Sequence, residues 1–81
     1  MKEQEIISAI EIHVTHYSVW TIGITDDPER RRSEQGNPKY WYQWRADTEG
    51  IARRVEKYFI NKGAKGASGG GDHLNYVYIF L

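Results

Sequence analysis

Residues 6–14, with the sequence IISAIEIHV, combine two hydrophobic periodicities. Apolar side chains recur at nearly every second position, which is the pattern of a strand with one buried face. The same segment contains a helical stripe formed by Ile6, Ile7, Ile10 and Val14. Because isoleucine and valine fit a pleated surface well, we predict a strand here and keep the helix as the alternative.

Three further segments have the composition of strands. Residues 17–25, YSVWTIGIT, and residues 40–46, YWYQWRA, are rich in β-branched and aromatic side chains. We expect both faces of the strand at 40–46 to be largely covered. The run YVYIFL at 76–81 predicts a last strand. Gly23 would weaken the strand at 17–25 unless another group has to approach its backbone closely.

A short helix is predicted after the second of these four strands. One of the two aspartates at 26–27 can cap it, Pro28 suits its first turn, and the GNP sequence at 36–38 ends it. The helix carries three consecutive arginines at 30–32. These arginines are either good helix formers that point into water, or a cationic group in which one side chain faces a phosphate.

A second helix is predicted from its cap at Thr48 to about Lys62. Its apolar positions follow the helical repeat, and they are Ile51, Ala52, Val55, Phe59 and Ile60. Together these elements predict one α+β domain over residues 1–81, with a small three- or four-stranded mixed sheet and two main helices.

Glu56 lies beside the apolar stripe of this second helix. It follows Ala52 by four residues and precedes Phe59 by three, so it is a neighbour of the packed face. One interpretation is a flanking carboxylate that extends toward solvent along the helix surface or pairs with an arginine. The other is a carboxylate in a partly dry cleft, which can bind a divalent cation.

Composition limits the classes of function. The eleven basic and eleven acidic residues cancel, although residues 28–57 hold eight Lys or Arg against five acids. This mild asymmetry permits a local cationic face but is weaker than that of most dedicated nucleic-acid binders. The chain has no cysteine, and no apolar run approaches the ~20 residues of a membrane span. We therefore expect a soluble, cytoplasmic protein without disulfides or thiolate metal sites.

Several common catalytic motifs are missing from the sequence. The glycine-rich stretch 63–71 follows a predicted helix and lacks the spacing of a phosphate-binding P-loop, so we expect an ordinary loop there. The three histidines show no metal-ligand spacing, and no GxSxG pattern occurs. The nine Trp and Tyr residues are better explained as core and sheet residues than as base-stacking groups.

A combination of short motifs nevertheless points to one family. The segment Thr21-Ile22-Gly23 ends a strand, a helix starts at 27–31 with DPERR, and the Asp-Thr-Glu turn at 47–49 leads through Ala52 to Glu56. In this order and spacing the chain resembles the GIY-YIG nucleases, whose small mixed sheet is flanked by helices and which cut phosphodiester bonds with one divalent metal ion. The resemblance covers about residues 17–62.

The resemblance implies roles for individual residues. Arg31 lies at the distance from Gly23 where the family has its phosphate-facing arginine, and Glu56 takes the place of the metal-binding carboxylate, with Mg²⁺ or Mn²⁺ as the cofactor. A planar cation and a hard oxygen ligand suit these two tasks. The expected contacts to nucleic acid, most simply DNA, come from Arg30, Arg32, Arg53 and Lys57.

The chain also departs from the family. Residues 6–14 contain no Gly-Ile-Tyr, Thr21 replaces the tyrosine of the second half-motif, and Gln35 stands where the family has a histidine or tyrosine. Neither Thr nor Gln is a base near neutral pH. His16 and Tyr17 are the nearest candidates to replace the lost groups, and we take Tyr17 as the third candidate catalytic residue. Two functions follow: a metal-dependent endonuclease with degraded activity, or an inactive relative that binds nucleic acid or a protein.

Overall fold

The computed structural model describes residues 1–67 and 73–81 of the chain. The elements within them are α1 (Glu3–His13), the 3-10 helix η1 (Tyr17–Val19), β1 (Thr21–Thr25), α2 (Pro28–Glu34), β2 (Trp41–Arg45), α3 (Glu49–Asn61), β3 (Lys65–Gly66) and β4 (Tyr76–Phe80). The strands form one mixed sheet in the order β2-β4-β1-β3, in which only the β1–β3 pair is parallel. This architecture confirms the predicted α+β fold with a small mixed sheet.

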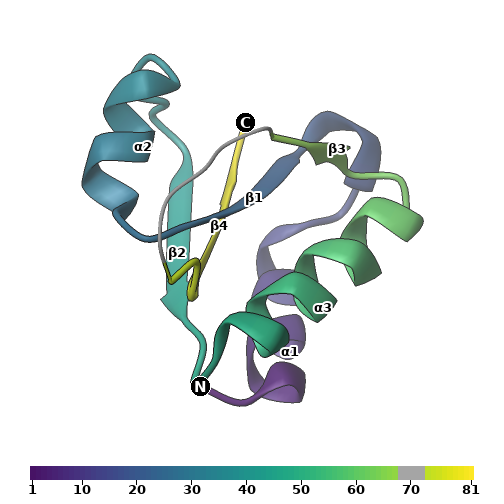
Figure 1. The fold of residues 1–81 in the computed structure, drawn as a ribbon. Coiled ribbons are helices and arrows are strands. Elements are labelled where there is room, and N and C mark those ends of the chain that lie inside the picture. Colours follow the sequence, from purple (N-terminus) through teal and green to yellow (C-terminus); the bar gives the residue numbers. More distant parts are fainter. Residues whose placement is uncertain (68–72) are drawn as a thin grey trace.

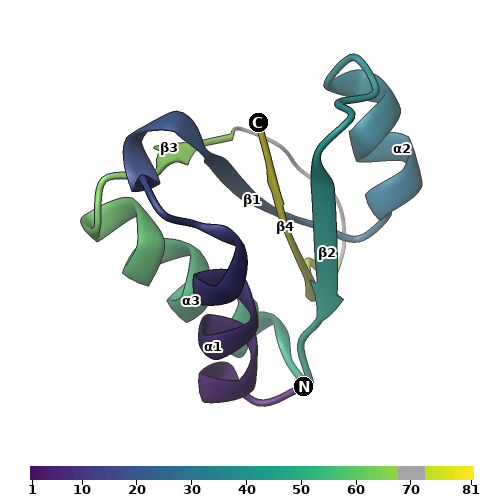
Figure 2. The same cartoon turned by 180° about the vertical axis from the view of Figure 1, so that it is seen from behind.

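The two faces of the sheet have different surroundings. In Figures 1 and 2, α1 and α3 lie together on one side of strands β1, β4 and β2, and α2 lies on the other side. Ile22 and Ile24 of β1 and Val77 and Ile79 of β4 belong to the buried core, together with residues of α1 and α3. The opposite face of the sheet carries Gly23 and does not take part in the core formed with α1 and α3.

Helix α1 stands where we predicted a strand over residues 6–14, so that prediction is wrong. Ile6, Ile7 and Ile10 are buried, whereas Ile12, which the strand pattern placed with Ile6 and Ile10, is 81% exposed. A strand would have put Ile7 on the face opposite Ile6. A helix buries both with Ile10 in one stripe, and α3 provides the apolar surface against which this stripe packs.

Two predicted strands are shorter or less covered than expected. Within 17–25 the structure has the 3-10 helix η1 followed by β1, so only the second half of the segment is a strand. β2 lies inside the predicted segment 40–46, but Gln43 and Arg45 are exposed. The expectation that both faces of this strand are largely covered is therefore wrong. The last strand, β4, confirms the prediction from YVYIFL.

Both predicted helices begin at the expected caps. The Asp27 carboxylate accepts a hydrogen bond from the Arg30 N–H (3.1 Å), and the Thr48 hydroxyl accepts one from the Ile51 N–H (3.2 Å). Such bonds satisfy N–H groups that the first turn of a helix leaves without partners. After α2 the chain leaves the helix through Gly36 at a positive φ of 86°, which glycine adopts without strain.

The glycine-rich stretch 63–71 was predicted as a loop. Its beginning contains the two-residue strand β3, which pairs with Thr21 and Ile22 of β1. Residues 68–71 lie outside the described residues. Among the helices of residues 1–67 and 73–81, none is long and apolar enough to span a membrane.

Candidate functional site

Tyr78 lies directly across from Gly23 in the sheet. The two residues are register partners in the antiparallel pair of β1 and β4, so their side-chain positions share one face. A Cβ atom at Gly23 would come within 2.5 Å of the Tyr78 ring carbon Cζ and would also overlap its hydroxyl oxygen. The glycine in this strand therefore serves the close approach that the sequence required, and the approaching group is a tyrosine ring.

Arg31 reaches the same region from α2. Its side chain is only 12% exposed, and its Nη1 atom pairs with the carboxylate of Glu34 one turn along the helix at 3.1 Å. The guanidinium is near enough to Tyr78 to lower the pKa of the phenol, although burial outweighs this effect. α2 thus places a largely buried cation on the side of the sheet that carries Tyr78.

Two buried polar atoms of this group lack hydrogen-bond partners. Among the described residues, Arg31 Nε and the Tyr78 hydroxyl are the buried side-chain nitrogen and oxygen atoms without one. An unsatisfied buried polar group costs about 1–3 kcal/mol, so such atoms in a native structure call for an explanation. Both atoms carry a hydrogen that they can donate. An oxygen-rich anion is a ligand that would satisfy both.

The protonation of Tyr78 follows from its surroundings. Burial raises the pKa of the phenol most strongly, Arg31 lowers it, and the carboxylates of Glu56 and Glu34 raise it further. A tyrosine with a raised pKa keeps its proton at neutral pH. Its hydroxyl is therefore a hydrogen-bond donor here and not a general base.

Glu56 approaches from α3 as the sequence suggested. It is half-buried, and burial raises the pKa of its carboxyl while the neighbouring Arg53 lowers it. Within the described residues Glu56 makes no ion pair, whereas Glu3, Glu34 and Glu49 each pair with an arginine. An ion pair with an arginine is thus not seen for Glu56, whereas its half-buried position fits a flanking carboxylate that extends toward solvent as well as one whose burial a bound cation would relieve.

A metal at Glu56 would have few protein ligands. The described residues contain no cluster of three or more His, Cys, Asp or Glu side chains that could hold a metal ion. Mg²⁺ accepts this situation, because it is often bound by one or two carboxylates with water and substrate phosphate completing the octahedron.

The four residues expected to contact nucleic acid are spread over two helices. Arg30 on α2 pairs with Asp26 (2.7 Å), and Arg53 on α3 pairs with Glu49 (2.8 Å). The Arg32 guanidinium donates to the Pro38 carbonyl at 3.0 Å, and Lys57 is exposed. Because α2 and α3 lie on opposite sides of the strands, these cations do not form one continuous helical surface (Figures 1 and 2).

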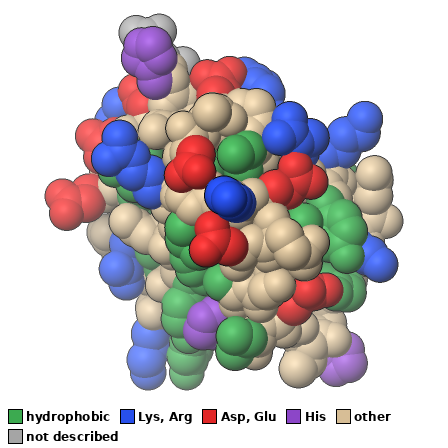
Figure 3. All heavy atoms as spheres, turned by 90° about the horizontal axis from the view of Figure 1, so that it is seen from below, with side chains coloured by type: hydrophobic (Ala, Val, Ile, Leu, Met, Phe, Trp, Pro, Cys, Tyr) green, Lys and Arg blue, Asp and Glu red, His purple; other side chains and the backbone are tan. Residues whose placement is uncertain are grey.

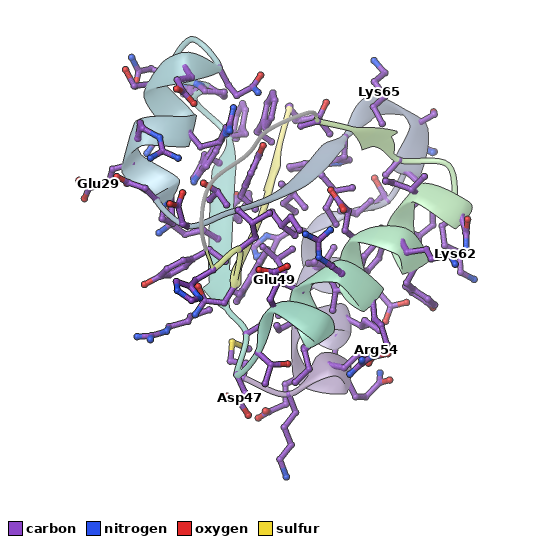
Figure 4. The ribbon with its side chains drawn as sticks, viewed as in Figure 1. Glu29, Asp47, Glu49, Arg54, Lys62 and Lys65 are labelled. Atoms are coloured by element: carbon purple, nitrogen blue, oxygen red, sulfur yellow. The ribbon has the colours of Figure 1, made fainter. Side chains whose placement is uncertain are left out.

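The surface charges are mixed in the views that show them. In Figure 3, which looks at the molecule from below, Lys and Arg side chains alternate with Asp and Glu, and hydrophobic groups lie between them. Figure 4 shows Glu49 turned toward the interior, where its carboxylate accepts a hydrogen bond from the Leu74 N–H at 2.9 Å. Glu29, Lys62 and Lys65 point outward in the same view. This distribution argues against a large single-sign patch on the face seen from below.

The remaining candidates from the sequence lie elsewhere. The ring of Tyr17 on η1 packs against Phe59, with ring centroids 5.9 Å apart, among residues of the core. Gln35 is the C-terminal cap of α2, where its N–H donates to the Arg31 carbonyl. Thr21 is paired with Phe80 on the face that carries Tyr78. Arg31 and Glu56 both influence the pKa of the Tyr78 phenol, although they come from helices on opposite sides of the sheet (Figures 1 and 2), and Tyr17 packs against Phe59 of α3.

Tyr78 is the member of this group that the sequence analysis missed. The available signal was the alternation in β4, which puts Tyr76, Tyr78 and Phe80 on one face and Val77 and Ile79 on the other. That alternation does not reveal which strand pairs with β4. The register that sets Tyr78 opposite Gly23 joins residues 55 positions apart and comes only from the folded chain.

A surface hollow lies apart from these residues. It is lined by Met1, Arg45, Ala46 and Asp47, and the Met1 amino group within it pairs with Asp47 at 2.7 Å. It contains none of the groups around Tyr78, so we assign it no part in the candidate site.

Comparison with known proteins does not place the chain in a family: no protein-family model matches it, and neither the curated proteins nor the solved structures include a significant match. The function of the chain therefore has to be inferred from the residues around Tyr78.

Proposed function

We propose that the group around Tyr78 binds a phosphate of a nucleic-acid backbone, most simply DNA, and promotes hydrolysis of the phosphodiester with a divalent cation at Glu56. The observation that carries this proposal is the pair of buried donors without partners, Arg31 Nε and the Tyr78 hydroxyl. A phosphate offers several oxygens to such donors, and the planar guanidinium suits it well.

Each residue of the site has a separate task in this proposal. Arg31 and Tyr78 donate to non-bridging oxygens and hold the phosphate where negative charge develops. Glu56 would hold Mg²⁺ or Mn²⁺, and the ion would supply charge neutralisation and a more acidic bound water. The raised pKa of Glu56 implies that a proton competes with the metal, so metal binding should improve as the pH rises.

The resemblance to GIY-YIG nucleases supports the same assignment. By the order and spacing of the motifs, Gly23, Arg31 and Glu56 correspond to positions that the family uses, and we propose that Tyr78 takes the place of the tyrosine that the family's opening strand supplies. The donor then comes from the last strand of this chain. We also propose a cytoplasmic setting, since the sequence has no cysteine that an oxidising compartment would pair.

A second function is favoured by a specific observation. Of the residues at the positions of the family's activating groups, Thr21 and Gln35 do not act as bases near neutral pH, and Tyr78, which we propose in the place of the tyrosine, holds its proton. General-base catalysis typically contributes ~10²–10⁴-fold. The unmodified protein should therefore cleave slowly, and the alternative is a module that binds nucleic acid or a protein partner without cutting.

Cleavage of labelled single-stranded and duplex oligonucleotides in Mg²⁺ or Mn²⁺ tests the proposal. We compare the wild type with Arg31→Lys, Glu56→Gln and Tyr78→Phe, and we expect each variant to lose cleavage. For the two donors the loss should approach the ~10²–10³-fold that removal of one oxyanion donor typically costs. Tyr78→Phe is informative because loss of an unpaired buried hydroxyl should leave stability unchanged or improve it.

Glu29→Gln is the matched control on the same helix, since Glu29 is exposed and points outward (Figure 4). It should retain cleavage. A second measurement follows phosphate binding without catalysis. Inorganic pyrophosphate should raise the melting temperature of the wild type and not that of Arg31→Lys. Cleavage that survives in all three site variants would refute the site, and oligonucleotide binding without cleavage would favour the binding module.

A further inference from the structure

One face of the sheet carries a row of aromatic side chains outside the main core. Strands β2 and β4 pair with Trp41 opposite Phe80, Gln43 opposite Tyr78 and Arg45 opposite Tyr76. Directly opposed residues of an antiparallel pair project from the same face, so these six side chains form one surface, which we call the aromatic face. It lies on the side of the sheet away from the isoleucines that pack against α1 and α3.

The rings of the aromatic face are nearly parallel. Trp41 stacks on Tyr78 with centroids 4.5 Å apart and planes at 9°, and it stacks on Phe80 at 5.6 Å and 18°. Tyr78 and Phe80 are themselves 6.1 Å apart at 16°. Trp41 and Phe80 are only half-buried. The stacked rings cover part of one another, and Trp41 and Phe80 remain partly accessible to solvent beside the buried Tyr78 ring.

Polar groups hold the accessible ring in place. The Trp41 indole N–H donates to the Gln43 side-chain oxygen at 2.8 Å, which fixes the plane of the indole. Gln43 is exposed, and its amide nitrogen keeps hydrogens that can be donated to a ligand. A pre-oriented ring beside a free amide donor suits recognition of a flat, polar-edged molecule such as a nucleobase.

Cations lie near both ends of β2. Arg45 is the last residue of β2, and its exposed guanidinium lies 5.9 Å from the centroid of the Tyr76 ring. Lys39 precedes β2, and its ammonium lies 5.7 Å from the centroid of the Tyr40 ring. Neither cation forms an ion pair with any described residue. Residues 39–45 and 73–81 contain no Asp or Glu. The charge along these two strands thus complements a polyanion.

We propose that the aromatic face binds single-stranded nucleic acid, with a base stacked on Trp41 and the backbone contacted by Arg45 and Lys39. The inference rests on the proposed function in one respect, because Tyr78 belongs to both surfaces and a strand lying on the aromatic face leads to the phosphate site. Aromatic rings on a sheet stack bases in general, while a duplex keeps its bases stacked on one another. The ligand is therefore an unpaired strand.

The test measures binding in EDTA, so that no hydrolysis is needed. The probe is a fluorescent oligothymidylate of about twelve nucleotides, within the ~4–16-nucleotide sites of known single-strand binders. It is compared with an abasic oligomer of equal length and charge. We expect the wild type to bind the oligothymidylate more tightly, and Trp41→Leu to weaken that binding by about 5- to 150-fold, the range for loss of one stacked base.

Matched variants separate stacking from charge and from folding. Trp44→Leu changes a partly buried tryptophan of the same strand on the opposite face, so it should leave the oligothymidylate affinity unchanged. Arg45→Gln should lower the affinity for the oligothymidylate and for the abasic oligomer by a similar factor. Circular dichroism verifies that each variant is folded. If a variant is unfolded, the affinities of the wild type for the oligothymidylate and for the abasic oligomer still decide the question.

The outcomes separate this inference from the proposed function. Equal affinity for the oligothymidylate and the abasic oligomer, or no binding of either, overturns the inference even if Arg31 and Glu56 support cleavage. If the protein never cleaves but its binding of the oligothymidylate depends on Trp41, the inference is supported and the proposal that the site hydrolyses phosphodiesters is contradicted. Tighter binding of duplex than of single strand also overturns it.

Discussion

At the scale of single residues, the contact between Gly23 and Tyr78 determines the form of the candidate site. The ring occupies the space that a side chain at position 23 would need, and Trp41 stacks on the same ring from β2. Glycine weakens a strand by its entropy and its missing side chain, so its presence here is explained by the close approach. The same approach puts the Tyr78 hydroxyl near Arg31 and Glu56.

Gly23→Ala should therefore destabilise the protein. The new Cβ would lie 2.5 Å from Tyr78 Cζ, so the ring or the strand has to move, and overpacking of this kind typically costs about 1–3 kcal/mol. Urea unfolding followed by circular dichroism measures the change. Gly50→Ala is the control, since a Cβ there meets nothing closer than 3.5 Å and alanine favours the helix. Equal stability of the Gly23 variant and the wild type would show that the ring adapts freely.

At the scale of elements, helix α1 shows how a tertiary partner settles an ambiguous periodicity. The segment fits both a strand and a helix in isolation, and the propensity of isoleucine favours the strand. α3 has its own apolar stripe, with Ala52, Val55 and Phe59 buried. A second helix with a matching stripe covers it, so the packing energy of the pair outweighs the local preference.

This account predicts opposite results for two neighbouring isoleucines. Ile10 is 1% exposed and Ile12 is 81% exposed. Ile10→Ala should lower the free energy of unfolding by about 2–5 kcal/mol, because it leaves a cavity in the core. Ile12→Ala should change it by less than about 0.5 kcal/mol. Thermal or urea unfolding of the two variants decides between α1 and a strand, which would bury both side chains on one face.

At the scale of the whole molecule, charge is balanced and the titration of a few groups determines how stability depends on pH. The formal net charge is zero, so long-range attraction to a polyanion is weak and binding has to come from local surfaces. Among the carboxyl groups whose pKa is shifted in the described residues, Glu56 is raised, while Asp47 and Glu49 are lowered by the amino terminus and by Arg53. The pKa of Glu56 is therefore shifted in the direction opposite to those of Asp47 and Glu49.

The raised pKa of Glu56 gives a pH dependence with a definite sign. A carboxyl group whose pKa is higher in the folded state contributes stability that is fully present below its unfolded value, near about 4.3, and is lost as the pH rises through the folded value. Glu56→Gln should therefore be more stable than the wild type at neutral pH, and the difference should shrink toward about pH 4. Urea unfolding across this range measures it.

Mg²⁺ and a control variant complete this experiment. If Glu56 holds the ion, saturating Mg²⁺ at neutral pH should raise the melting temperature of the wild type and not that of Glu56→Gln. Glu11→Gln, at an exposed position on α1, should keep the wild-type response to Mg²⁺ because Glu56 is intact. A stability difference that does not vary with pH would contradict the assigned shift.

Local signals in the sequence determined much of the fold. Asp27 and Thr48 cap their helices because an N-cap side chain bonds to an N–H only three residues away, and the YVYIF alternation defines the two faces of β4 without any partner. Arg31 and Glu56 became site candidates through the resemblance to GIY-YIG nucleases, which depends on the order and spacing of short motifs, and their roles stay predictions.

Contacts between distant segments were decided only by the tertiary structure. The helical form of α1 depends on α3, and the pairing of β4 between β1 and β2 depends on how β1 and β4 bury one face in the core that they share with α1 and α3. A change of register by one residue would turn every side chain of β4 to the opposite face, and nothing local to YVYIF prevents it. For that reason the sequence alone indicated an arginine and a glutamate, and only the folded sheet added Tyr78 and the aromatic face beside it.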